Sequence, residues 1–145
     1  MIESAARERY YRRLFVVAAV YDIGLGLAFL FFPRASFDLV GAGSKFPEYT
    51  AYVTLIAVFL VVIGVGYALL ARGDLVRNLD LIAIGTLYKL AYTGAALFYL
   101  ITGDYPHIAF VAIFGVADLA FLVLMAECWW YVKGMEKPRV PEPAV

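Results

Sequence analysis

The sequence predicts an all-α, polytopic membrane protein: an up-and-down bundle of four transmembrane helices with both termini in the cytoplasm. Of its 145 residues, 64% are hydrophobic and 17% are charged, whereas soluble domains are about 45–50% apolar and about 25% charged. Four apolar runs also reach the roughly 20 residues that an α-helix needs to cross a hydrocarbon core of ~30 Å. These runs are residues 14–32, 50–71, 81–101 and 108–131.

The orientation follows from lysine and arginine outside the runs, because cytoplasmic flanks carry an excess of these residues. Nine of them fall in the amino-terminal segment, the second loop and the carboxyl-terminal tail, and two fall in the first and third loops. We therefore expect both termini to be cytoplasmic. Aromatic residues agree with this orientation, since tyrosine and tryptophan gather at the expected inner boundary as Tyr10, Tyr11, Trp129, Trp130 and Tyr131.

Proline and glycine mark the ends of the predicted spans. Pro33 ends the first span, because proline lacks a backbone donor and restricts the residue before it. The loop 34–49 follows, and we expect a short interfacial helix within it near residues 37–40. The connections 72–80 and 102–107 are short, so the helices that they join should be antiparallel neighbours.

The amino terminus has one feature of a signal peptide, because basic residues precede an apolar run. The run is 19 residues long, carries Asp22 near its centre and lacks a clear small-residue cleavage site. We therefore expect the first span to be retained. The chain then divides into a four-helix domain, 1–132, and a proline-rich cytoplasmic tail, 133–145.

Small residues on the first two spans predict where helix backbones approach closely, because such residues allow tight packing in lipid. Both spans contain an I-G-x-G-x-A string, at residues 23–28 and 63–68. The strings reflect either this packing or chance in a glycine-rich apolar chain. The stripes comprise Ala18, Asp22 and Gly26 on the first span and Ala57, Gly64 and Ala68 on the second.

Three of the four runs carry a charge at a similar depth. Asp22 and Lys89 each lie eight residues from the inner end of their run, roughly 12 Å, and Asp118 lies eleven residues from Trp129, roughly 16 Å. A lone charge at this depth costs at least about 2.5–3.5 kcal/mol. We therefore expect the three side chains to face inward and meet near the middle of the bilayer.

The charges within this predicted cluster do not balance, because two carboxylates and one ammonium sum to −1. We expect Asp22 and Asp118 to share one titratable proton and to titrate as a coupled unit. Tyr21, Tyr88 and Tyr92 adjoin the cluster, and their hydroxyls are suited to satisfy its lone pairs or to form part of a proton path. The candidate ligand or proton site therefore comprises Asp22, Lys89, Asp118, Tyr21, Tyr88 and Tyr92.

Three interpretations of the cluster are open. Ionisable groups inside a membrane mark a substrate, ion or proton site by default. The same residues also suit a salt bridge that fixes helix register and binds nothing. A Schiff-base lysine with aspartate counterions, as in retinal proteins, uses a similar residue set, although four helices form a poor retinal pocket.

The chain lacks the motifs of the common catalytic classes. Cys128 is its only cysteine and His107 its only histidine, so neither a disulfide nor a bis-histidine haem site can form within one chain. It contains no GxSxG, HExxH or phosphate-binding glycine loop, and its net charge of zero provides no field for nucleic acid. We expect no catalytic residue, metal, cofactor or nucleic-acid partner.

Five short stretches resemble a known family: FFPRASFDLVG (31–41), GVGYALLARGD (64–74), IAIGTLYKL (82–90), GDYP (103–106) and GVADLAF (115–121). They are similar to the DoxX-like four-helix integral membrane proteins of bacteria. The resemblance implies an up-and-down bundle in the bacterial inner membrane. It also implies an accessory role, because some relatives accompany quinone-linked oxidoreductases. Similar proteins commonly have Tyr-Asn where this chain has Tyr21 and Asp22, so the second carboxylate departs from the pattern.

Two functions are compatible with these observations. The first is a non-catalytic accessory or binding subunit whose buried Asp-Lys-Asp centre binds a lipid, a quinone-like ligand or a partner. The second is a small proton-coupled carrier or channel in which the same residues bind and release a proton. The expected partners are membrane lipids, together with subunits of a membrane complex or further copies of the chain.

Overall fold

The computed structural model describes residues 2–135 and confirms an all-α bundle of four long helices in an integral membrane protein. Three long helices are α1 (Ile2–Phe31), α3 (Thr50–Arg72) and α4 (Leu79–Thr102). The fourth consists of α5 (Ile108–Phe110), the π-helix η2 (Val111–Ala117) and α6 (Asp118–Met135). Each is long and apolar enough to cross a membrane. From residue 136 onward, the predicted tail lies outside the described residues.

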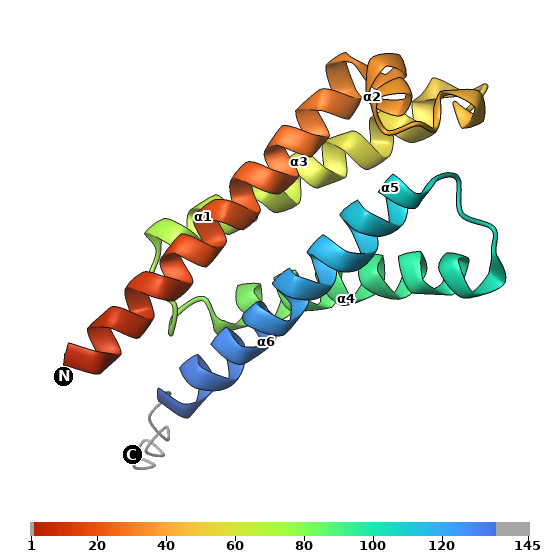
Figure 1. Cartoon of the computed structure of the whole chain (residues 1–145). Coiled ribbons are helices and arrows are strands. Elements are labelled where there is room, and N and C mark those ends of the chain that lie inside the picture. The colour runs from red at the N-terminus through yellow and green to blue at the C-terminus, as the bar shows by residue number, and fades with distance from the viewer. Residues whose placement is uncertain (1, 136–145) are drawn as a thin grey trace, which may run out of the picture.

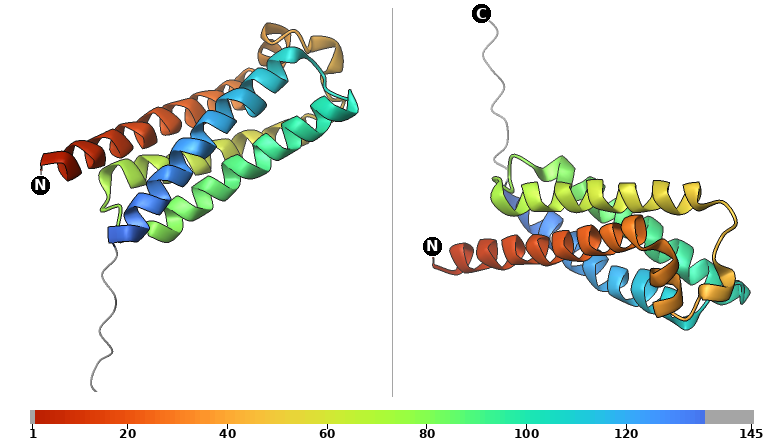
Figure 2. Two further views of the ribbon diagram at one scale, coloured as in Figure 1. Left: turned by 60° about the horizontal axis from the view of Figure 1, so that its bottom comes forward. Right: turned by 90° about the horizontal axis from the view of Figure 1, so that it is seen from above.

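The long helices run alternately up and down, and the beginning of α1 and the end of α6 lie at one end of the bundle (Figures 1 and 2). We call this the terminal end. The opposite, loop end carries the short helix α2 (Pro33–Leu39), the 3-10 helix η1 (Gly43–Lys45) and the connection from α4 to α5. The short connections from α3 to α4 and from α4 to α5 therefore join antiparallel helices, as predicted.

Pro33 separates α1 from α2. The residue before it, Phe32, has a non-helical backbone with φ −131° and ψ 50°, and Pro33 occupies the start of α2. Proline is well accommodated there, because the first backbone N–H of a helix has no intrahelical partner. The predicted short helix in this loop is present and begins at Pro33, earlier than the expected residues 37–40.

The glycines of the I-G-x-G-x-A strings bring α1 and α3 together. A Cβ on Gly26 would lie 2.8 Å from the Ala57 carbonyl oxygen, and a Cβ on Gly64 would lie 2.9 Å from the Ile23 nitrogen. Gly24 and the second glycine of α3, Gly66, have no such neighbour within 4 Å. One glycine of each string is therefore required for close backbone approach, which confirms the packing interpretation for Gly26 and Gly64.

The hydrophobic core fills the terminal half of the bundle. Its buried side chains come from residues 11–19 of α1, from the ends of α3, α4 and α6 nearest the terminal end, and from Leu75 in the connection between α3 and α4. Cys128 belongs to it and is fully buried, so its thiol is a packing group in this structure. The members of the core are Tyr11, Leu14, Phe15, Ala18, Ala19, Tyr67, Leu70, Leu75, Ile82, Met125, Cys128 and Val132.

The π-helix η2 interrupts the fourth span directly before Asp118. The sequence predicted one continuous helix here, whereas residues 111–117 adopt the wider π pattern of i→i+5 hydrogen bonds. Such a segment changes which side chains share a face, because its residues advance at a different angle from those of an α-helix. Single π turns are frequent at functional sites, and Asp118 directly follows this π-helix.

Candidate functional site

Lys89 of α4 lies at the centre of the site. Its Nζ donates hydrogen bonds to both carboxylate oxygens of Asp22, at 2.8 and 3.0 Å, and to Oδ1 of Asp118, at 2.9 Å. An ammonium group has three donors, so these bonds use all of them. The side chains come from α1, α4 and the first residue of α6. The predicted meeting of the three charges is confirmed.

The three charged residues are almost completely buried. Asp22 and Lys89 are 0% exposed and Asp118 is 1% exposed. The Lys89–Asp22 ion pair connects the α4–α6 pair of helices to the α1–α3 pair, whereas the Lys89–Asp118 ion pair lies within the α4–α6 pair. Removing one partner of such a buried pair leaves a charge without compensation, which is strongly destabilising.

Aromatic rings enclose the ammonium group. Nζ of Lys89 lies 5.1 Å from the ring centroid of Tyr21, 5.3 Å from that of Tyr88 and 5.2 Å from that of Phe121. The ring of Tyr67 is also near, at 5.8 Å. Rings within about 6 Å attract a cation through their negative faces. The lysine is thus stabilised by two carboxylates and by an aromatic shell.

Two tyrosine hydroxyls anchor this shell to neighbouring helices. The hydroxyl of Tyr21 donates to the carbonyl oxygen of Ile113 in η2, at 2.9 Å, and that of Tyr67 donates to the carbonyl oxygen of Gly85, at 2.9 Å. A Cβ on Gly85 would lie 2.6 Å from Cε1 of Tyr67. The absence of a side chain at Gly85 therefore allows the Tyr67 ring to reach its position.

Tyr67 and Phe121 are members of the site that the sequence did not reveal. Both are aromatic residues in apolar spans, a pattern that is equally compatible with lipid contact or core packing. The sequence signal for Tyr67 is a pair of glycines: Gly64 lies one turn before Tyr67, and Gly85, against which the Tyr67 ring packs, lies one turn before Lys89. Only the packing of α3 against α4 shows that Tyr67 and Gly85 face each other.

Two buried hydroxyls near Lys89 have no hydrogen-bond partner among the described residues. They belong to Tyr88, which precedes the lysine, and to Thr93, which lies one turn further along α4 and is 2% exposed. Buried polar groups are hydrogen-bonded in the large majority of cases, to protein or to ordered water. The region around Lys89 on α4 therefore retains polar capacity that the protein itself does not use.

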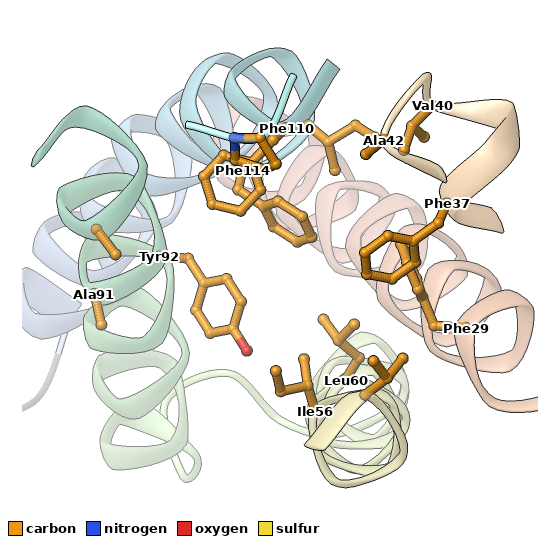
Figure 3. Close-up of a pocket in the computed structure, with 14 residues that line it drawn as sticks. Phe29, Phe37, Val40, Ala42, Ile56, Leu60, Ala91, Tyr92, Phe110 and Phe114 are labelled. Carbon is orange, nitrogen blue, oxygen red and sulfur yellow. The ribbon is translucent and has the colours of Figure 1, made fainter. Parts of the chain in front are cut away.

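A cavity of about 470 Å³ occupies the loop half of the bundle. Figure 3 shows its wall, to which all four long helices contribute and over which the segment that contains α2 folds. The cavity is open on one side, because Ala91 and Ala95 of α4 and Ile56 of α3 line it while remaining exposed. The lining residues are Phe29, Phe37, Val40, Ala42, Val53, Ile56, Leu60, Ala91, Tyr92, Ala95, Pro106, Phe110, Ile113 and Phe114.

Tyr92 links the cavity to the charged centre. Its hydroxyl points into the cavity (Figure 3), and its ring lies 4.7 Å from the ring of Tyr88, centroid to centroid. Tyr88 in turn lies over the Lys89 ammonium. The structure therefore brings all six predicted candidates into one connected group, in which Tyr92 is the member at the cavity wall.

Two further residues occupy the ends of the bundle rather than this group. Nδ1 of His107 accepts a hydrogen bond from the backbone N–H of Ala109, at 3.2 Å, and so caps the start of α5. Glu127 is exposed near the terminal end and accepts a hydrogen bond from the hydroxyl of Tyr11, at 3.0 Å. Within residues 2–135, no three His, Cys, Asp or Glu side chains are grouped to hold a metal ion.

Comparison with known proteins adds no assignment. No protein-family model, no curated protein and no solved structure matches the chain.

Proposed function

We propose that this chain is a non-catalytic membrane protein that binds a lipid or a quinone-like ligand in the cavity of its loop half. The observation that carries the proposal is the cavity itself, which has about 470 Å³ of space and an almost wholly apolar lining. This volume lies within the range of about 300–1,000 Å³ that is typical of small-molecule sites. The chain would act as an accessory subunit that presents or retains such a ligand for a partner complex.

The open side of the cavity supports a ligand that comes from the bilayer. The exposed lining residues Ile56, Ala91 and Ala95 lie on membrane-spanning parts of α3 and α4, not on a loop. An apolar molecule dissolved in lipid can pass between these helices without crossing water. A water-soluble, charged metabolite would lose its hydration there without gaining a charged partner.

In this proposal the Asp22–Lys89–Asp118 cluster has a structural role: it holds the helices around the cavity in position. The cluster joins α1, α4 and α6. Of these, α1 and α4 line the cavity, and α6 continues the π-helix η2, which also lines it. Its buried ion pairs fix the relative positions of these helices, which is the best-attested use of buried polar groups.

A cavity-filling variant tests the binding function. The protein and an Ala95→Trp variant would be extracted gently from their own membrane, and bound small molecules would be identified by mass spectrometry. We expect the wild-type protein to retain an apolar ligand and Ala95→Trp to lose it. Ala120→Trp is the matched control, because Ala120 is exposed on α6 and does not line the cavity. A wild-type protein without any retained ligand would contradict the proposal.

A second function, a small proton-coupled carrier, is favoured by one observation: two carboxylates share a single ammonium group in the membrane-spanning region. In such a carrier Asp118→Asn should abolish pH-driven flux into liposomes while the protein stays folded. Asp38→Asn is the control, because this exposed carboxylate lies in α2, away from the cluster. Absence of pH-dependent flux in the wild-type protein under every imposed gradient would exclude the carrier function.

The proposed setting is the bacterial inner membrane, with both termini in the cytoplasm. It rests on the distribution of lysine and arginine, which favours the terminal end as the cytoplasmic one. In a bacterium, green fluorescent protein fused after Val145 should fluoresce, and alkaline phosphatase fused there should be inactive. The opposite pair of results would reverse the proposed orientation.

A further inference from the structure

The cavity contains one hydroxyl-bearing side chain among the 14 that line it. This side chain, Tyr92, extends from α4 and directs its hydroxyl toward the space between the helices, on the side of Ile56 and Leu60 (Figure 3). Small-molecule sites combine a mainly apolar lining with a few polar groups that fix the orientation of the ligand. Tyr92 is the residue in this cavity that is able to do so.

We infer that the cavity selects a neutral apolar chain that carries an oxygen at its head, and that Tyr92 binds this oxygen through its hydroxyl. The inference rests on the proposed function and specifies which class of ligand the cavity takes. The head lies against Tyr92, on the side of the Asp22–Lys89–Asp118 cluster, and the chain extends among the apolar lining residues toward the loop end.

The electrostatics of the lining exclude a charged head. None of the lining side chains is ionisable apart from Tyr92. The nearest cation along α4, Lys89, already uses its three donors on Asp22 and Asp118. Asp22 and Asp118 do not line the cavity either. An anionic or cationic head would therefore lose its hydration in an apolar space without a counter-charge in the cavity wall, which costs far more than one hydrogen bond returns.

The position of Tyr92 also explains why the oxygen-bearing head of the ligand should face the Asp22–Lys89–Asp118 cluster. The Tyr92 ring packs against Tyr88, whose buried hydroxyl has no partner among the described residues. The end of the cavity at Tyr92 therefore adjoins a second hydroxyl, that of Tyr88, whereas the opposite end is bounded by the apolar residues Phe37, Val40 and Pro106. An oxygen placed at that opposite end would be buried without a side-chain donor.

Photolabelling in lipid nanodiscs tests the inference. The probe is a farnesol analogue with a diazirine in its chain, and mass spectrometry maps the labelled residues. Competitors at equal concentration in the membrane are farnesol, a benzoquinone with a ten-carbon tail, the hydrocarbon farnesane, farnesyl phosphate and farnesylamine. The first two separate an alcohol source of the oxygen from a carbonyl source, and the last three test for the neutral oxygen itself.

We expect labelling of cavity residues, with competition by farnesol, by the benzoquinone or by both, and little competition by farnesane or the charged probes. Tyr92→Phe should weaken binding of the competing neutral probe roughly 2- to 12-fold, the equivalent of one hydrogen bond. It should leave the weak effect of farnesane unchanged. Tyr10→Phe is the control, because Tyr10 is 46% exposed near the terminal end.

Different results would overturn the binding function of the cavity and the role of Tyr92 within it. If Ala95→Trp prevents labelling but Tyr92→Phe changes no competition, the cavity binds apolar chains and the role of Tyr92 is overturned. Stronger competition by farnesyl phosphate or farnesylamine than by both neutral probes overturns the selection of a neutral head. If no probe labels the cavity of the wild-type protein, the inference and the proposed binding function are both lost.

Discussion

Lys89 is bound unequally by its two carboxylate partners: Asp22 accepts two of its hydrogen bonds, at 2.8 and 3.0 Å, whereas Asp118 accepts one, at 2.9 Å. Asp22 is thus the main counter-charge of Lys89. The geometry indicates that Lys89 and Asp22 form a neutral pair to which Asp118 is added. Substitutions in the cluster should therefore have graded effects.

We predict that Lys89→Met is the most damaging of three cluster variants, followed by Asp22→Asn and then Asp118→Asn. Lys89→Met leaves two buried carboxylates without a cation and should lower the free energy of unfolding by about 3–5 kcal/mol. Asp118→Asn keeps the Lys89–Asp22 pair and an oxygen acceptor, so its loss should not exceed about 1.5 kcal/mol. Reversible unfolding in mixed micelles measures these values. A larger loss for Asp118→Asn than for Lys89→Met would contradict the graded arrangement.

The glycines of α1 and α3 provide a matched set of substitutions. Gly26→Ala and Gly64→Ala place a Cβ within 3.0 Å of the facing helix and should destabilise the protein by about 1–3 kcal/mol through overpacking. Gly24→Ala and Gly66→Ala meet no atom within 4 Å and should be neutral or stabilising by up to about 1 kcal/mol. Thermal unfolding of the four variants measures the contrast. Equal effects within each string would show that close backbone approach is not what these glycines provide.

The Tyr67 hydroxyl should make a measurable contribution to stability. Tyr67→Phe removes its hydrogen bond to the Gly85 carbonyl oxygen while keeping the ring that stacks on Phe15. The expected loss is about 0.5–1.5 kcal/mol in the free energy of unfolding. Tyr52→Phe serves as the control, because the Tyr52 side chain is 66% exposed. The assigned hydrogen bond would be in error if the two variants were equally stable.

The hydroxyl of Tyr21 should protect the π-helix η2. Tyr21→Phe removes the hydrogen bond to the Ile113 carbonyl oxygen, so the amides of residues 111–118 should exchange with deuterium roughly 2- to 12-fold faster. Hydrogen exchange with mass spectrometry on the protein in nanodiscs measures this change. In the same experiment Tyr10→Phe should leave these amides unchanged. An unaltered exchange rate in the Tyr21 variant would mean that η2 is held by its backbone alone.

Much of the candidate site could be found from the sequence because buried charge is so unfavourable. Asp22, Lys89 and Asp118 stand out in apolar spans, and helix rise alone placed them at one depth. Since each had to be compensated, their meeting was the expected solution, and the ion pairs confirm it. The apolar members of the site had no comparable signal. Nothing about Phe121 as a single residue indicates that its ring lies 5.2 Å from an ammonium group.

The fourth span shows a second limit of sequence reasoning. Residues 108–131 were predicted as one helix from their apolar character, and the segment does span the bundle. The π pattern of residues 111–117 was not predicted, because VAIFGVA is equally compatible with α-helical hydrogen bonds. Its side-chain bond from Tyr21 comes from another helix, so the local sequence contains only part of the cause.

By itself, the sequence determined the four spans and the convergence of three charges, since the bilayer penalises both unpaired backbone groups and isolated charges. Only the tertiary structure decided that Lys89 donates two hydrogen bonds to Asp22 and one to Asp118. It also placed a hydrophobic core on one side of this layer and an apolar cavity with Tyr92 in its wall on the other. Empty space arises from how the side chains of four helices fail to fill the volume between them, and no single segment encodes it.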